Sequence, residues 1–146
     1  MVRIKQPLLF PFLLAADRGP QTSIFPMPSP HPLSLTLRTR SRVLAVSFSD
    51  GTQFELPFEY LRVYSPSAEV RGHGPGQETL QIGKHNVQIT KIEPVGRYAV
   101  RLIFDDGHDT GLYTWSYLHE LGCEREKKWQ HYLGRLADLG IKYPAG

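Results

Sequence analysis

The sequence contains a single cysteine, Cys123, among its 146 residues. One thiol excludes a disulfide within the chain and any metal site built from several thiolates of one copy. This scarcity fits a reducing compartment, so we expect a cytoplasmic protein. Apart from three basic residues on its C-terminal side, nothing nearby in the sequence argues for a reactive thiol. We expect Cys123 to be a small, partly buried residue at the start of a helix.

Long apolar runs are absent as well. The most apolar stretch, residues 7–16 (PLLFPFLLAA), is interrupted by prolines and is shorter than the ~20 residues that a membrane-spanning helix needs. Its basic start and the small residues at its end imitate a secretory signal. We interpret residues 1–32 as an irregular extension, mobile or loosely packed on the domain. The alternatives are a cleaved signal, an overlong gene start and a membrane-surface anchor.

The third absence is a cluster of charge of one sign. The net charge of +3 comes from the two ends, because residues 34–122 carry nine basic and ten acidic side chains. A protein that binds nucleic acid usually concentrates Lys and Arg on one face. Nucleic acid is therefore not expected as a partner, and weak binding through the basic tails remains a third hypothesis.

The sequence does contain many signals for short elements, with 13 glycines and 12 prolines. Alternating apolar residues predict strands over 34–38, 42–49 and 52–56, the last two joined by a two-residue type I′ turn at Asp50-Gly51. A short helix should follow Pro57. A second hairpin is predicted over 86–93 and 98–104, with Tyr98 on the same face as Val100, and a short strand over 110–113.

Two helices are predicted near the C-terminal end. The first begins at Thr114 as N-cap and ends at Gly122 as the C′ residue. The second runs over about 124–139 and carries one apolar stripe: Trp129, Tyr132, Leu133, Leu136 and Ala137. We expect the aromatic residues of both helices to pack in the core or at its edge, the alternative being an exposed partner surface.

The chain also shows weak internal similarity. Residues 42–61 read as strand, FSDG, strand and PFEYL, and residues 98–118 as strand, FDDG, strand and TWSYL. This indicates a duplicated hairpin-plus-helix unit, or a chance likeness between two such units. We predict an α+β fold in which antiparallel β-hairpins form a small sheet, packed with short helices and a C-terminal amphipathic helix. The boundaries are an extension over 1–32, a domain over 33–122, and a helix and tail over 123–146.

Three segments carry a family resemblance: residues 61–77 (LRVYSPSAEVRGHGPGQ), residues 92–118 and the preceding FSDGTQFELPFEYLR stretch. They resemble the gamma-butyrobetaine hydroxylase-like N-terminal domain family, a domain of unknown function. In the hydroxylases this domain precedes a catalytic domain that uses iron and 2-oxoglutarate. No such domain follows in this chain, so we expect neither an enzyme nor a cofactor.

The resemblance also implies the fate of a zinc site. The family's Cys-x-Cys-x-x-Cys run falls on Ser65, Ser67 and Val70, and its later histidine falls on His108. A serine hydroxyl stays protonated near neutral pH and valine cannot ligate, so one of four ligands remains. We expect that zinc binding has been lost.

The remaining implications concern partners and small ligands. Similar domains occur alone in bacteria or attached to ATPases that carry iron–sulfur clusters, which suggests an accessory, protein-interaction role linked to iron–sulfur protein assembly. The alternative is a small-anion or small-molecule site. Its candidate residues are Arg62, Arg71, His73, Asp106 and His108. The plainer interpretation of the same residues is a tight glycine loop and a turn histidine bonded to an aspartate.

Overall fold

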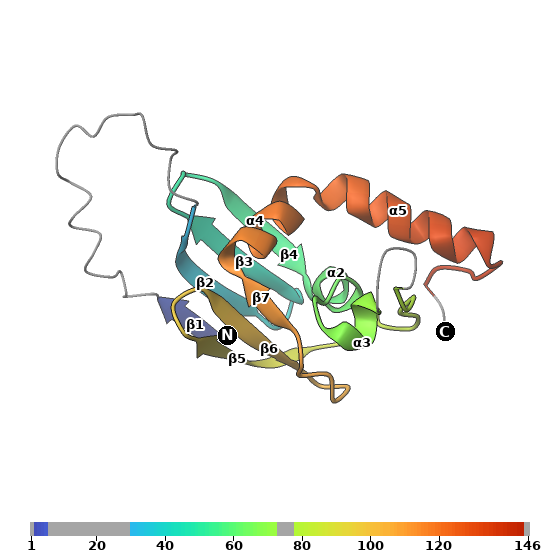
Figure 1. Cartoon of the computed structure of the whole chain (residues 1–146), viewed down its shortest axis with the longest axis horizontal. Helices are drawn as coiled ribbons and strands as arrows, with labels where there is room; N and C mark the ends of the chain where they lie inside the picture. The colour runs from blue at the N-terminus through green and yellow to red at the C-terminus, as the bar shows by residue number, and fades with distance from the viewer. Residues whose placement is uncertain (1, 6–29, 73–77, 145–146) are drawn as a thin grey trace, which may run out of the picture.

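The computed structural model describes residues 2–5, 30–72 and 78–144. Four antiparallel strands form the first sheet, in the order β1 (Val2–Lys5), β2 (Pro32–Arg38), β3 (Val43–Phe48) and β4 (Gln53–Pro57). Three form the second: β5 (Ile89–Val95), β6 (Ala99–Phe104) and β7 (Leu112–Thr114). Figure 1 shows the two sheets as separate units of the fold. The α+β class and the antiparallel hairpins are confirmed.

Two helices follow β4, and they are α2 (Phe58–Val63) and α3 (Ala68–Arg71). Two more follow β7, the short α4 (Trp115–Cys123) and the longer α5 (Arg125–Asp138). Thr114 caps α4 as expected, because its side chain accepts a hydrogen bond from the Tyr117 backbone N–H. In Figure 1, α5 extends away from the sheets past α2. It packs through a small second cluster formed by Val63, Tyr132 and Leu136.

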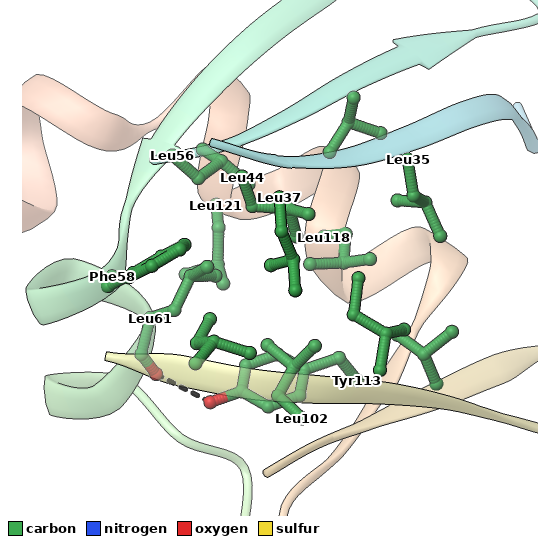
Figure 2. Packing of buried hydrophobic residues seen from close by; sticks show 14 of the residues in the cluster. Leu35, Leu37, Leu44, Leu56, Phe58, Leu61, Leu102, Tyr113, Leu118 and Leu121 are labelled. Carbon is green, nitrogen blue, oxygen red and sulfur yellow. Dashed lines mark hydrogen bonds between the residues drawn. The ribbon is translucent and has the colours of Figure 1, made fainter. Parts of the chain in front are cut away.

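Both sheets contribute to one main core. Strand β3 buries alternate residues, as its period of two requires, so that Leu44, Val46 and Phe48 face inward. They meet Val100, Leu102 and Phe104 of β6, together with side chains of α2 and α4. Figure 2 shows part of this core, with Leu44 and Leu102 among the labelled side chains between the elements. Tyr113, fully buried, donates a 2.5 Å hydrogen bond to the Leu61 carbonyl and so joins β7 to α2.

Several local predictions were wrong. Tyr98 is 74% exposed, because it lies in the β5–β6 turn before the buried alternation begins. Gly122 does not end α4, which continues through Cys123. Instead, a Cβ at Gly122 would lie 2.4 Å from the Phe54 ring, so the glycine permits close helix–strand packing. Cys123 ends a helix rather than starting one, and it is exposed. The structure also has a helix over Ala68–Arg71, α3, that the sequence did not predict.

The N-terminal segment is described only in part. Val2–Lys5, within the segment expected to be irregular, pairs with β2. Most of residues 1–32, and with them the alternatives weighed for that segment, lie outside the described residues. No helix in the described part of the chain has the length and apolar character needed to cross a membrane.

Candidate functional site

The β3–β4 turn and the β6–β7 turn have the same backbone geometry. Gly51 donates its N–H to the Phe48 carbonyl, and Gly107 donates to the Phe104 carbonyl. Both glycines have positive φ, 90° and 93°. Each is the last residue of a three-residue loop, so the predicted two-residue type I′ turn at Asp50-Gly51 was wrong. In each loop an aspartate accepts a backbone N–H two residues on: Asp50 from Thr52 and Asp106 from His108.

Each turn aspartate binds a side chain from the helix that follows the other hairpin. Arg62 of α2 donates to Asp106 at 2.9 Å, and His119 of α4 lies 2.8 Å from Asp50. A tyrosine of each helix also donates a hydrogen bond to a backbone carbonyl of the other unit. Tyr60 donates to the Leu121 carbonyl at 2.7 Å and Tyr117 to the Tyr64 carbonyl at 2.6 Å. These exchanged contacts agree with a duplicated hairpin-plus-helix unit.

Around Asp106, the structure brings together most of the residues expected to form a site. We call Arg62, Ser65, Ser67, Asp106 and His108 the Asp106 cluster. Ser65 Oγ lies 2.8 Å from His108 Nε2 and accepts the Ser67 backbone N–H at 3.2 Å. Ser67 Oγ lies 2.8 Å from Thr110 Oγ1. The cluster therefore ties the α2–α3 connection to the β6–β7 turn through hydrogen bonds.

Charge within this cluster is balanced by pairing. Asp106 accepts from Arg62 and also from Lys84 at 2.7 Å, and its side chain is 23% exposed. Burial by itself would raise the pKa of Asp106, but the hydrogen bonds from Lys84, the His108 backbone and Arg62 outweigh burial and lower the pKa to about 2. Asp106 is thus ionised and paired with two cations.

His108 is neutral in these surroundings. Burial, and then the nearby Arg62 charge, lower the pKa of His108 below its ordinary value. Its Nδ1 lies 3.4 Å from Glu69 Oε1. Because a carboxylate only accepts, Nδ1 carries the proton and Nε2 accepts from the Ser65 hydroxyl. Nε2 is therefore hydrogen-bonded within the protein, and Nδ1 faces the Glu69 carboxylate.

The chemistry of these donors does not fit zinc. Ser65, Ser67, Val70 and His108 do come together, since all four are buried between α3 and the β6–β7 turn. The set offers two hydroxyls, one imidazole and an alkyl group where a structural zinc needs four strong donors. Within the described ranges, no group of three or more His, Cys, Asp or Glu side chains is arranged to hold a metal ion.

The small-anion hypothesis finds only part of its residues assembled. A hollow of about 290 Å³ is lined by Arg62, Asp106 and His108, together with Glu69. Arg71 instead points to a neighbouring groove, where its guanidinium lies 4.9 Å from the centre of the Tyr117 ring. His73 lies outside the described residues. The three assembled residues bind one another or their neighbours.

The neighbouring groove, which we call the α5 groove, is the larger feature at about 810 Å³. It runs between the α3 region with residues 78–81 on one side and helices α4 and α5 on the other. Its aromatic and aliphatic lining comprises Val63, Tyr64, Val70, Leu80, Tyr117 and Tyr132. Its charged lining comprises Arg71, Glu78, Glu120, Glu124, Lys127, Lys128 and Arg135, and His131 lies beside them.

Sequence reasoning missed two features. The α5 groove could not be found, although the apolar stripe of α5 did predict the side that packs. A second missed feature is the contact between Cys123 and His119, whose Sγ and Nδ1 are 3.6 Å apart. Their spacing of four residues on one helix was the available signal.

Comparisons with known proteins give one consistent result. The family model described as "Gamma-butyrobetaine hydroxylase-like, N-terminal" matches residues 35–119. Two NMR solution structures are similar, with 45% and 48% identity and TM-scores of 0.68 and 0.69. They cover 80% and 82% of this chain and 90% of each of theirs. No curated protein matches the chain.

A third similar structure is a crystal structure from Acidithiobacillus ferrooxidans. It is described as a protein with unknown function that belongs to the DUF971 family. It shares 40% identity, covers 63% of this chain and 92% of its own, and has a TM-score of 0.54.

Proposed function

This chain belongs to the gamma-butyrobetaine hydroxylase-like N-terminal domain family, also called DUF971, and from that premise we propose that it is a non-catalytic protein-interaction module. Its binding surface is the α5 groove, which receives a segment of a partner protein. Because the family's function is unknown, the proposal depends on this chain's own geometry. The single observation that carries it is the size and lining of the groove.

The groove combines an aromatic floor with a charged rim, as protein-binding surfaces do. Tyr64 and Tyr117 are half-buried in it, and Tyr117 is held by its hydrogen bond to the Tyr64 carbonyl. Leu80 lies at the edge of the second hydrophobic cluster. An apolar side chain of a partner would displace water from these surfaces.

The rim gives the partner a preferred charge. Lys128 pairs with Glu120 at 3.3 Å. Lys127 is exposed, and Arg135 donates to the Glu78 carbonyl at a long 3.5 Å. Lys127 and Arg135 are available along one side of α5. We therefore expect a partner segment with an acidic side chain next to its apolar anchor.

The Asp106 cluster supports a role without catalysis. A general base or nucleophile has to reach substrate, but Nε2 of His108 is hydrogen-bonded to Ser65 and its Nδ1 faces Glu69. The Arg62 side chain is 9% exposed and paired with Asp106. These contacts favour a structural role for the cluster over the small-anion alternative.

The experiment is a quantitative capture from cells that express the protein at its native level. A tagged Lys127→Glu, Arg135→Glu variant reverses two charges of the rim. The matched control, Arg40→Glu, Arg97→Glu, makes the same charge change at two exposed turn positions that do not line the groove. Captured proteins are identified by mass spectrometry, and both variants are checked for unchanged unfolding.

We expect the wild type and the control to capture at least one protein at a constant ratio. The rim variant should capture roughly tenfold less of that protein, which corresponds to about 1.4 kcal/mol of lost binding free energy. A partner that acts in iron–sulfur protein maturation would support the setting that the family resemblance suggests. Equal capture by both variants would reject the α5 groove as the binding surface.

A further inference from the structure

We propose that Cys123 is a reactive thiol whose proton is taken by His119, itself oriented by Asp50, and that it undergoes exchange with low-molecular-weight disulfides. We call these three residues the Cys123 site. It lies at the β3–β4 turn, away from the Asp106 cluster, and the interaction role proposed above does not use it. The inference therefore stands or fails independently.

The geometry is that of a nucleophile, a base and an orienting carboxylate. Cys123 Sγ lies 3.6 Å from His119 Nδ1, and His119 Nε2 lies 2.8 Å from Asp50 Oδ2. The aspartate is held in turn, because its other oxygen accepts from the Thr52 backbone at 3.0 Å and from the Thr52 hydroxyl at 2.6 Å. Side chains from a helix and from a distant turn are thus aligned in one row.

The pairing with Asp50 decides which ring nitrogen faces the thiol. Hydrogen bonds from Thr52 lower the pKa of Asp50 to about 2, so the carboxylate is ionised and can only accept. His119 therefore carries its proton on Nε2, which leaves the lone pair of Nδ1 directed at Cys123. Unlike the imidazole of His108, this ring has one nitrogen engaged with the thiol alone.

Packing fixes the imidazole while the sulfur stays accessible. The His119 ring meets Phe48 and Phe54 edge-on, with centroid distances of 4.9 and 5.6 Å. The His119 side chain is 21% exposed, and Cys123 is exposed. Cys123 lies at the C-terminal end of α4 and not at a helix N-terminus, so the proton acceptor at His119 is the feature that promotes reaction here.

The proposed step is thiol–disulfide exchange. His119 Nδ1 takes the Sγ proton, and the thiolate attacks one sulfur of a small disulfide. A new S–S bond forms to Cys123 while the old S–S bond breaks, and the leaving thiolate takes the proton back from His119. Cys123 is oxidised and the departing half of the disulfide is reduced, so no other reactant is needed. With one cysteine in the chain, the product is a mixed disulfide.

The test uses the full chain and the aromatic disulfide 5,5′-dithiobis(2-nitrobenzoate), whose released thiolate is followed by absorbance at neutral pH. His119→Gln removes the base, and Asp50→Asn removes the carboxylate that orients it. His85→Gln, in the turn before β5 and outside both the Cys123 site and the α5 groove, is the matched control. Each rate is divided by the rate of the same variant in concentrated guanidinium chloride, which cancels the intrinsic reactivity of the thiol.

We expect the folded wild type and His85→Gln to react faster than their unfolded forms. His119→Gln should lose roughly tenfold or more of the folded rate, because no base then faces the thiol. Asp50→Asn should fall in between. Oxidised glutathione should then add one glutathionyl group to the wild type and none to Cys123→Ser. A folded wild type no faster than the unfolded chain, or a His119→Gln variant as fast as the wild type, would overturn the proposal. The wild-type ratio decides even if a variant fails to fold.

Discussion

The β3–β4 turn and the β6–β7 turn have the same backbone geometry but place their aspartates in different surroundings. Asp106 lies beside Arg62, whose side chain is 9% exposed, and beside a second cation, Lys84. Asp50 lies at an exposed turn, and its carboxylate contacts Nε2 of His119. The same turn geometry therefore places Asp106 in an ion pair with the buried Arg62 in one half of the molecule. In the other half it places Asp50 where it orients the imidazole of His119.

The Asp106 cluster holds the segment where the family resemblance implies a zinc site. Ser65, Ser67 and His108 occupy the corresponding positions, and hydrogen bonds join them directly. Hydrogen bonds between such neutral side chains can fix two segments without a cation. In the same cluster, Nη1 of Arg62 is buried without a hydrogen-bond partner among the described residues. The contrast between the halves can be tested by making the same substitution at equivalent positions of both.

The largest expected difference is between Asp106→Asn and Asp50→Asn. The first leaves the buried Arg62 charge without its carboxylate, and we expect a loss of about 3 kcal/mol in the free energy of unfolding. The second removes an exposed contact and should cost far less. Urea denaturation of both variants measures the difference. Equal losses would mean that the two turns contribute alike and would remove the contrast.

A second comparison concerns the glycines at the two junctions. A Cβ at Gly122 would lie 2.4 Å from the Phe54 ring, and a Cβ at Gly111 would lie 2.5 Å from Ser65 Oγ. We expect each alanine substitution to cost about 2 kcal/mol through overpacking. Gly134→Ala is the control. A Cβ there would meet no atom within 4 Å beyond its own helix in the part of the chain that the structure describes, so this variant should gain up to about 1 kcal/mol. Thermal unfolding that ranks Gly134→Ala with the other two would contradict the packing account.

The reciprocal tyrosines should respond less. Tyr60→Phe and Tyr117→Phe each remove one hydrogen bond to a carbonyl of the other half, and we expect a loss of about 1 kcal/mol for each. The Tyr60 variant should lose somewhat more, because that side chain is 1% exposed. Tyr98→Phe, at a 74% exposed side chain, should be neutral. If it destabilised the protein equally, the loss would not come from the exchanged bonds.

Stability should also depend on acidity. The pKa of His108 is lowered in the folded state, so its contribution is complete above about pH 6.5 and is lost as the pH falls through the folded value. The pKa of Asp106, lowered to about 2, adds a second loss as the pH falls from about 4 toward 2. Urea midpoints across this range should show that Asp106→Asn weakens the lower step. An unchanged profile would show that Asp106 does not contribute it.

The sequence predicts local features well where one element determines them. The alternation in β3, the cap at Thr114 and the turn position at Asp50-Gly51 follow from neighbouring residues, although the loop is one residue longer than a type I′ turn. The role of Gly122 could not be predicted because it depends on Phe54, far away in the chain. Tyr98 was misplaced because alternation alone does not show where burial begins.

Site residues divide in the same way. The family resemblance placed Ser65, Ser67 and His108 together, and the structure joins them. Arg71 was expected beside them because it is near in sequence, yet it turns to Tyr117. The α5 groove arises where segments distant in sequence meet. The contact between His119 and Asp50 likewise spans 69 residues, and no pattern within either segment indicates it.

The most direct test of the account's central claim, that the Asp106 cluster is held by hydrogen bonds and not by a cation, is a metal analysis of protein purified without chelator or added metal. Elemental mass spectrometry should find far less than one zinc per chain, and added zinc should leave the thermal unfolding midpoint of the wild type unchanged. One tightly bound zinc per chain, lost in a His108→Ala variant, would contradict it.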